Sequence, residues 1–352
     1  MSHQYQAIGW NRQKRVYDVV VLSGVILYIA FFIGFGTLLF PYATAETLII
    51  RAAGSAAFLL LHIVLCIGPL CRLDLRFLPL LYNRRHLGVV TFLLGAVHGI
   101  FAIIQFHSLG DKDPLVSLLT SNQNFRSLPD FPFQQLGFLA LVILFLMAAT
   151  SHDFWLRNLT PPIWKSLHML VYVAYALLIG HVTLGLLQSE TSPPLAVATG
   201  AGLVAVLSLH LAAAWRERKV DRKKLNPVGK QFVDACSVES IPEKCAAVIS
   251  VSGERVAIFK FDGKISAISN VCRHQNGPLG EGKIIDGCVT CPWHGYQYLP
   301  ETGASPPPFT EKVSTFHTQI VNGRVWIDAK PNPPGTHVEP SRIPDVDAGV
   351  EA

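Results

Sequence analysis

The chain has 352 residues, of which 50% are hydrophobic and only 15% are charged. Soluble globular domains carry about a quarter charged residues, so this composition excludes an ordinary soluble protein and predicts a membrane protein. The formal net charge is +5, but most lysines and arginines flank apolar runs, so the charge does not indicate nucleic-acid binding.

The apolar residues are concentrated between residues 19 and 215. A transmembrane helix needs about 20 mostly apolar residues, and six segments reach or approach this length. They are Val19–Phe40, Thr47–Leu70, Leu87–Phe106, Phe133–Ala149, Ile163–Leu187 and Leu195–Trp215. Residues 1–18 are polar and lack the pattern of a cleavable signal peptide, so we expect a short N-terminal segment followed by a six-helix α-helical transmembrane bundle.

Basic residues mark one end of these spans. They precede the first span, separate the second from the third and the fourth from the fifth, and follow the sixth: Arg12, Lys14, Arg15, Arg72, Arg76, Arg84, Arg85, Arg157, Lys165, Arg216, Arg218, Lys219, Arg222, Lys223 and Lys224. The positive-inside rule therefore predicts that both termini are cytoplasmic. We expect a multi-pass protein of a bacterial inner or plasma membrane. We expect residues 216–230 to form a basic, helical linker near anionic lipid.

Beyond residue 230 the chain has the pattern of short β-strands. Asp262-Gly263, Asp286-Gly287 and Asn322-Gly323 each separate two strand-like runs, which is a strong hairpin signal. We therefore predict a small antiparallel all-β domain over residues 231–329. Residues 330–352 are rich in proline and acidic residues and poor in large apolar ones, which predicts a disordered tail.

Two short motifs within this β region carry metal-ligand chemistry. Cys272-Arg273-His274 is followed, after sixteen residues, by Cys291-Pro292-Trp293-His294. Two tight loops, each with one cysteine and one histidine, can close on a two-iron cluster from opposite sides. Two cysteines and two histidines also suit zinc, which is the alternative.

The motifs and their setting resemble the Rieske 2Fe–2S family. The resemblance implies that Cys272 and Cys291 bind one iron while His274 and His294 bind the other. Rieske proteins that oxidise quinol carry two further cysteines, but Gly277 and Trp293 stand in those places here. The domain is therefore more similar to the ferredoxin-like and oxygenase-associated branch, which suits a reducing cytoplasm and a lower potential.

Two neighbouring features have interpretations of their own. We interpret Cys288, which lies on the flank of a hairpin, as a structural residue and not as a ligand. Pro306–Pro308 is either a loop that covers the cluster or a rigid turn.

Six histidines lie in or beside the apolar segments: His62, His86, His98, His168, His181 and His210. Ionisable residues at membrane depth are costly and usually functional. His62 and His210 are each alone on a span, so we expect them to bond a neighbouring helix.

The other four histidines form two levels on the third and fifth spans. His86 and His98 are twelve residues apart, and His168 and His181 are thirteen apart, or roughly 18 and 20 Å along a helix. His98 with His181 could clamp a b-type haem in the outer half of the bundle, and His86 with His168 could clamp another in the cytoplasmic half.

These spans resemble those of the ferric-reductase-like transmembrane family. The resemblance rests on Asn83–Gly88 before His98 and on Pro162–His168 before His181. It implies haem ligands at His98, His168 and His181, with His86 as a further candidate. The resemblance leaves open whether the protein binds one haem or two.

Together the two resemblances predict an electron-transfer oxidoreductase component without assigned catalytic residues. No dinucleotide-binding glycine pattern follows a strand, so we expect a separate cytoplasmic reductase or ferredoxin as donor and an unknown acceptor across the lipid bilayer. Alternatives are a terminal ferric or metal-chelate reductase and a non-enzymatic redox sensor. An oxygenase would need a further mononuclear iron site, for which the sequence leaves no room.

Overall fold

The computed structural model describes residues 12–81, 83–128, 130–152, 155, 159, 161–189, 193–222, 224–225, 231–274, 276–293 and 295–344. His294 therefore lies outside the described residues. The chain divides into two compact units, which are described separately. The membrane unit comprises residues 11–69 and 83–210. The β unit contains residues 70–82 and 211–352 together with the N-terminal residues 1–10.

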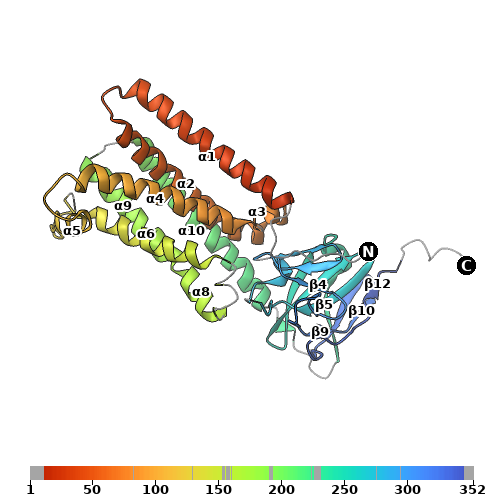
Figure 1. Ribbon diagram of the computed structural model, residues 1–352. Coiled ribbons are helices and arrows are strands. Elements are labelled where there is room, and N and C mark those ends of the chain that lie inside the picture. Colours follow the sequence, from red (N-terminus) through yellow and green to blue (C-terminus); the bar gives the residue numbers. More distant parts are fainter. Residues whose placement is uncertain are drawn as a thin grey trace, which may run out of the picture. The chain divides into compact units, whose positions relative to one another are not determined.

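Helices make up most of the membrane unit (Figure 1). The long helices are α1 (Arg12–Leu39), α2 (Ala45–Leu73), α4 (Arg84–His107), α6 (Phe133–Thr150), α8 (Pro161–Met169), α9 (Val171–Ser189) and α10 (Pro193–Arg222), with shorter α3 (Leu78–Leu81) and α5 (Pro114–Thr120). Six spans in the described part of the chain are long and apolar enough to cross a membrane, which confirms the predicted bundle. The fifth span is interrupted, because α8 ends at Met169 and α9 begins at Val171.

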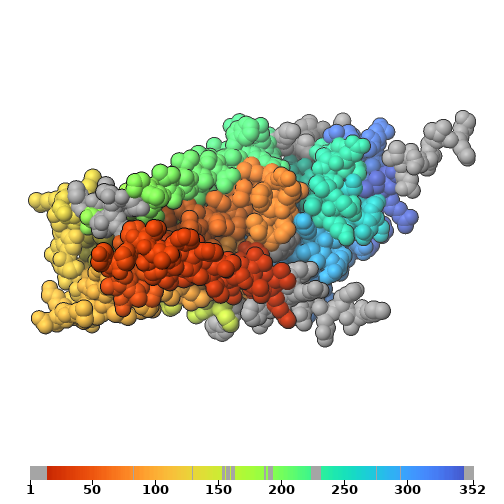
Figure 2. Space-filling view, turned by 90° about the horizontal axis from the view of Figure 1, so that it is seen from above, coloured from red at the N-terminus to blue at the C-terminus, as the bar shows by residue number. Residues whose placement is uncertain are grey.

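Small residues allow the helices of the membrane unit to approach closely. Ala140 of α6 and Ala174 of α9 are completely buried against each other's helices, in a cluster with Ile143 and Leu144. The outer surface of α1 is different: Ile26 and Phe35 are 65% and 59% exposed, and the helix lies along the surface of the unit (Figure 2). Such apolar exposure is what a lipid-facing helix requires.

The β unit consists of short strands in three sheets. The strands are β1 (Lys224–Leu225), β2 (Phe232–Ser237), β3 (Ala246–Val251), β4 (Glu254–Phe261), β5 (Lys264–Ser269), β6 (Lys283–Ile285), β7 (Cys288–Thr290), β8 (Gln297–Tyr298), β9 (Thr315–Phe316), β10 (Thr318–Val321), β11 (Arg324–Asp328) and β12 (Ser341–Arg342). One sheet has the order β1-β3-β4-β5-β12 with β9 beside β5, and the others are β10-β11-β2 and β6-β7-β8. The pairs are antiparallel except β1 with β3.

The three predicted hairpins are confirmed. The turns join β4 to β5, β6 to β7 and β10 to β11, and both residues of each turn have positive φ, from 47° at Asp262 to 76° at Gly287. Two successive positive φ angles are the type I′ geometry that Asp-Gly and Asn-Gly adopt readily. Local turn chemistry therefore determines where these strands reverse.

The predicted disordered tail is wrong for residues 330–344. Ser341 pairs with Ile265 at the edge of β5, and its side-chain oxygen lies 2.7 Å from the hydroxyl of Thr318. The N–H of Val338 donates to the carbonyl of Glu301 at 2.8 Å. This segment is held by backbone hydrogen bonds, with Val338 buried and Ile343 packed against the core, so its composition, rich in proline and acidic residues, did not reveal its order. Residues 345–352 lie outside the described residues.

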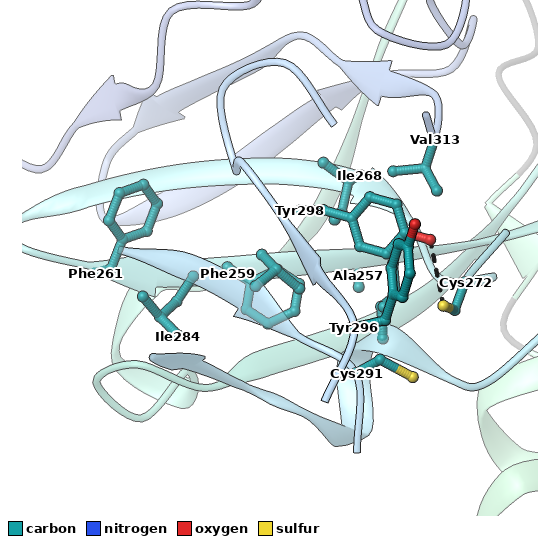
Figure 3. Close-up of a cluster of buried hydrophobic side chains, with 12 residues drawn as sticks. Ala257, Phe259, Phe261, Ile268, Cys272, Ile284, Cys291, Tyr296, Tyr298 and Val313 are labelled. Carbon is teal, nitrogen blue, oxygen red and sulfur yellow. Dashed lines mark hydrogen bonds between the residues drawn. The ribbon is translucent and has the colours of Figure 1, made fainter. Parts of the chain in front are cut away.

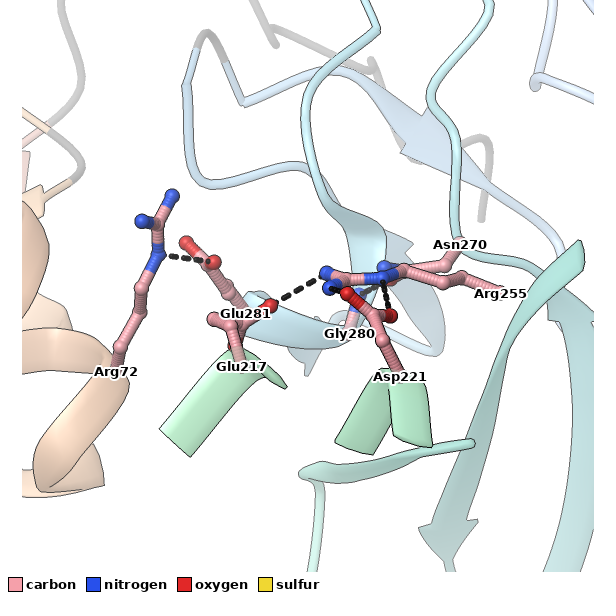
Figure 4. Close-up of polar contacts among 7 residues, drawn as sticks. All are labelled: Arg72, Glu217, Asp221, Arg255, Asn270, Gly280 and Glu281. Atoms are coloured by element: carbon pink, nitrogen blue, oxygen red, sulfur yellow. Dashed lines mark hydrogen bonds and ion pairs between the residues drawn. The ribbon is translucent and has the colours of Figure 1, made fainter. Parts of the chain in front are cut away.

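The end of α10 belongs to the β unit. The helix expected over residues 216–230 ends at Arg222, and Lys224–Leu225 form strand β1 instead. Arg255, near the start of β4, binds Glu217 at 2.5 Å and Asp221 at 2.8 Å (Figure 4). In the same unit, Arg72 binds Glu281 at 2.8 Å, in the segment between the two cluster motifs. These ion pairs join the β-sheets to the helix ends within the unit.

Candidate redox sites

The two cysteine–histidine motifs lie on loops with the same hydrogen-bond pattern. In the first, the N–H of Cys272 donates to the carbonyl of Gly277 at 2.9 Å, and the carbonyl of Cys272 accepts the N–H of Asn276 at 2.7 Å. In the second, Cys291 N–H donates to Tyr296 at 2.7 Å and its carbonyl accepts Gly295 N–H at 2.9 Å. Asn276 and Gly295 both have positive φ, 59° and 72°. Each loop is therefore the tight turn that the motif spacing predicts.

The two cysteines lie in one buried core. Cys272 and Cys291 are each 1% exposed and pack in a cluster that includes Tyr296 and Tyr298 (Figure 3). A Cβ added to Gly277 would lie 2.7 Å from the Sγ of Cys291. The first loop thus approaches the second as closely as a glycine backbone allows.

Gly277 also faces Trp293. The same added Cβ would lie 3.2 Å from the indole ring. By the resemblance described above, these are the two positions at which quinol-oxidising Rieske proteins carry their two further cysteines. Their contact here shows that the two positions are spatial neighbours, and a glycine–tryptophan contact takes the place of a covalent bridge.

Tyr298 is a site residue that the sequence analysis missed. Its hydroxyl lies 3.3 Å from the Sγ of Cys272 and accepts the N–H of Arg273 at 3.0 Å, which leaves the phenolic proton available to the sulfur. Burial, reinforced by the negative charge of Cys272, raises the pKa of Tyr298. Its position at the end of β8, seven residues after Cys291, is the only signal in the sequence.

His274 lies on the outer side of this core. Its ring stacks on Tyr296 with centroids 4.7 Å apart and planes inclined by only 6°. Tyr296 donates its hydroxyl proton to Glu311. Its ring makes an edge contact with the ring of Phe309, with centroids 4.9 Å apart. The segment after Pro306–Pro308 therefore covers Tyr296, the residue that supports His274.

This donor set fits a two-iron cluster. In the part of the chain that the structure describes, no three His, Cys, Asp or Glu side chains surround one point. Each iron of a Rieske cluster takes only two protein ligands, so the two buried thiols and the half-buried imidazole of His274 match that division. The fourth residue of the set, His294, lies outside the described residues.

In the membrane unit, His98 and His181 lie together. Their ring centroids are 6.1 Å apart and the ring planes are inclined by 82°. Each Nδ1 bonds a backbone carbonyl of another helix at 2.9 Å, Ile50 for His98 and Phe133 for His181. A histidine that donates from Nδ1 keeps the lone pair of Nε2 for a metal.

The separation of the two rings suits one metal between them. Two imidazoles that bind a metal from opposite sides, at roughly 2 Å each, have centroids about 6 Å apart. The spacing of His98 and His181 therefore suits two imidazoles that would hold one metal, such as a haem iron, between them.

His86 and His168 each have a different environment. The Nδ1 of His86 lies 2.9 Å from the carboxylate of Asp18. His168 stacks on Trp164 at 3.8 Å, its Nδ1 bonds the Trp164 carbonyl, and its Nε2 lies 3.4 Å from the hydroxyl of Ser151. The structure thus provides these two histidines with separate partners.

His62 and His210, the two histidines that we expected to bond a neighbouring helix, meet that expectation only in part. His210 lies 3.1 Å from the hydroxyl of Tyr172 on α9, as expected for a histidine that bonds a neighbouring helix. His62 instead bonds the carbonyl of Phe58 in its own helix and packs edge-on against Tyr175.

Two protein-family models match the chain in succession. The ferric reductase like transmembrane component matches residues 53–179, and the Rieske [2Fe-2S] domain matches residues 231–317. The ferredoxin component of the alkene monooxygenase system of Xanthobacter autotrophicus is 30% identical over 104 residues, which cover 29% of this chain and 85% of that protein. Through its C-terminal domain, the chain belongs to the Rieske [2Fe-2S] family.

Other relatives match the same Rieske domain. The biphenyl dioxygenase ferredoxin subunit of a Pseudomonas species is 35% identical over 100 residues, covering 28% of this chain and 91% of that protein. Among solved structures, the Sphingomonas yanoikuyae B1 ferredoxin is 26% identical, covers 27% of this chain and 96% of its own, and has a TM-score of 0.26.

These findings confirm the predicted combination of domains. A ferric-reductase-like transmembrane domain precedes a Rieske domain, so the chain is a multi-pass membrane protein with an electron-transfer role. The transmembrane match includes His98 and His168 and ends two residues before His181.

Proposed function

We propose that this protein conducts electrons through a membrane, between a cytoplasmic Rieske cluster and one b-type haem held by His98 and His181. The observation that carries the proposal is the His98–His181 pair, whose centroids lie 6.1 Å apart in the membrane unit of a chain that also bears a Rieske domain. When bound, the two cofactors supply one-electron chemistry, while the protein positions and tunes them.

The Rieske domain contributes Cys272, His274, Cys291 and His294 as cluster ligands. Burial of the two cysteines excludes water from the sulfur side, and Tyr298 offers a hydrogen bond to the Cys272 sulfur. Stacking on Tyr296 holds the His274 ring at the outer side of the loop, where a redox partner can approach it.

The contacts favour one haem over two. The Nδ1 bonds of His98 and His181 to other helices orient both rings, as metal-ligating histidines require. The Nδ1 bonds of His86 and His168 do not distinguish them from the first pair, but the Nε2 of His168 already lies 3.4 Å from the hydroxyl of Ser151, which argues against a second pair. We assign these two a structural role at the cytoplasmic end of the bundle.

The basic loops support the orientation and the choice of donor. By the positive-inside rule, their charge supports a cytoplasmic Rieske domain. Several of its relatives are named ferredoxin components of oxygenase systems. We infer that a cytoplasmic reductase or ferredoxin supplies electrons to the Rieske domain and that an acceptor across the bilayer receives them. We also propose residues 19–215 as the membrane domain, 216–230 as the linker and 231–329 as the Rieske domain.

An optical and EPR redox titration of the purified protein tests the proposal. We expect one low-spin b-type haem and one Rieske signal per chain. After rapid reduction of the cluster by a soluble ferredoxin reductase, the haem should become reduced in turn. A haem that stays oxidised beside a reduced cluster would contradict the proposed order. Protein that binds a cluster but no haem would contradict the proposal itself and favour a redox sensor.

A further inference from the structure

His98 and His181 are held by two helix pairs in the same manner. The Nδ1 of His98, on α4, bonds the carbonyl of Ile50 on α2, and the Nδ1 of His181, on α9, bonds that of Phe133 on α6. Both distances are 2.9 Å, and in both cases the carbonyl lies 48 residues before the histidine. The same spacing and the same bond therefore occur twice in the membrane unit.

A glycine follows each of these carbonyls by four residues. A Cβ added to Gly54 would lie 2.6 Å from Nδ1 of His98, and a Cβ added to Gly137 would lie 2.7 Å from Nδ1 of His181. A Cβ atom essentially never lies this close to another heavy atom. The two imidazoles thus occupy the space that a side chain at either glycine would need.

Helix geometry explains the spacing of four. Residues n and n+4 share a face of an α-helix, and the Cβ of n+4 leans toward the N-terminus, over the carbonyl of n. That carbonyl already accepts the N–H of residue n+4. At both sites the imidazole occupies the place that a Cβ at n+4 would take, so its bond to that oxygen depends on the glycine.

The other histidines in the described part of the membrane unit lack this combination. His62, His168 and His210 bond the carbonyl four residues earlier in their own helices. Gly202 approaches His62, but at Cδ2 and Nε2, the opposite edge of that ring. Among the glycines that the structure describes, only Gly54 and Gly137 approach the Nδ1 of a histidine, so the pattern is specific to His98 and His181.

We propose that the haem site consists of two copies of one half-site, each with a carbonyl at n, a glycine at n+4 and a histidine at n+48, and that Gly54 and Gly137 are positioning residues. This inference rests on the proposed function, since it assigns these glycines to the haem. Each glycine leaves room for one imidazole to lie against its helix and thereby orients Nε2 toward the metal. We call this arrangement of glycine and imidazole a seat. Because both copies face the same metal, loss of either seat affects the same haem.

The test compares Gly54→Ala and Gly137→Ala with Gly200→Ala in full-length, detergent-purified protein. Gly200, on α10, is the matched control because nothing lies within 4 Å of a Cβ added there. The readouts are the haem-to-cluster ratio and the EPR g-values of the haem. The Rieske signal serves as an internal measure of folded protein.

We expect each seat variant to weaken haem retention by about tenfold, as substitutions next to metal-binding histidines typically do, and to shift the g-values of any haem that remains. Gly200→Ala should match the wild type. Full haem with unchanged g-values in both seat variants would overturn the inference and leave the proposed function intact. Wild-type protein without haem would overturn the proposed function.

A stability measurement keeps the inference testable if the variants fold poorly. Gly54→Ala should lower the Tm of the haem-free protein when His98 is present, and should have little effect in a His98→Ala background, where the ring is absent. The pair Gly137→Ala and His181→Ala should behave in the same way. Equal destabilisation in the presence and in the absence of the histidine would show that the glycines serve only helix packing. That result would overturn their proposed positioning role.

Discussion

The hydroxyl of Tyr298 lies 3.3 Å from the Sγ of Cys272 and at the same time accepts the N–H of Arg273. The backbone bond orients the phenol, so its proton is directed to the sulfur. Hydrogen bonds to cluster sulfurs stabilise the more negative, reduced state and raise the reduction potential. The sequence predicts a lower reduction potential for the cluster, because the two further cysteines of quinol-oxidising Rieske proteins are absent. The hydrogen bond from Tyr298 acts in the opposite direction.

Replacement of Tyr298 by phenylalanine should therefore lower the potential of the cluster. Loss of one net hydrogen bond of about 1 kcal/mol corresponds to about 40 mV for a one-electron couple. An EPR-monitored titration measures the shift. Tyr296→Phe is the matched control, because it removes a hydroxyl that binds Glu311 and keeps the ring that stacks on His274. Equal potentials in Tyr298→Phe and the wild type would contradict the role of this bond.

Haem content should depend on two histidines of the membrane unit. We expect His98→Ala and His181→Ala each to abolish haem binding, since one imidazole cannot hold the iron from both sides. His62→Ala and His210→Ala should retain the haem. A pyridine haemochrome assay gives the number per chain.

His86→Ala and His168→Ala decide between one haem and two. With one haem, both variants keep the wild-type content. A loss of half the haem in either variant would show that a second site exists and would refute our assignment.

Cys288 should be chemically inert although it lies only three residues before Cys291. Burial, with a smaller contribution from Asp286, raises the pKa of its thiol. The folded protein therefore favours the neutral thiol over the thiolate. The contribution of this thiol to the free energy of unfolding is complete at lower pH and is lost as the pH rises through the raised pKa. We expect slow alkylation of Cys288 near neutral pH and a full Rieske signal in Cys288→Ala. Mass spectrometry after maleimide treatment measures the alkylation of Cys288, and denatured protein provides the fully reactive reference.

The ion pairs of Arg255 should stabilise the β unit modestly. They are partly exposed, so we expect Arg255→Met to cost about 1 kcal/mol and to lower the temperature at which cluster absorbance is lost. Molar salt should reduce the difference from the wild type. Arg324→Met, which breaks a more exposed pair with Asp234, should have the smaller effect. The reverse order would contradict the structural importance of Arg255.

The proposed orientation can be checked by labelling intact cells. A cysteine in place of Asp111, in the exposed α4–α6 connection, should react with a membrane-impermeant maleimide. A cysteine in place of exposed Glu254, in the Rieske domain, should react only after lysis. The opposite pattern would place the Rieske domain outside.

Features that depend on neighbouring residues were predictable from the sequence. The six spans follow from local hydropathy, the three hairpins follow from Asp-Gly and Asn-Gly turns, and the family of the C-terminal domain follows from motif spacing. In each case the physical cause acts within about twenty residues, so the sequence carries the whole signal.

The sequence by itself determined which side chains are chemically capable of holding a cluster and a haem. Only the tertiary structure decided how they are arranged. It brought Tyr298 to the sulfur of Cys272, paired Ser341 with β5, and set His98 against Gly54 on another helix. These contacts join residues 26, 76 and 44 positions apart, where no local pattern records which helix or strand will be the neighbour.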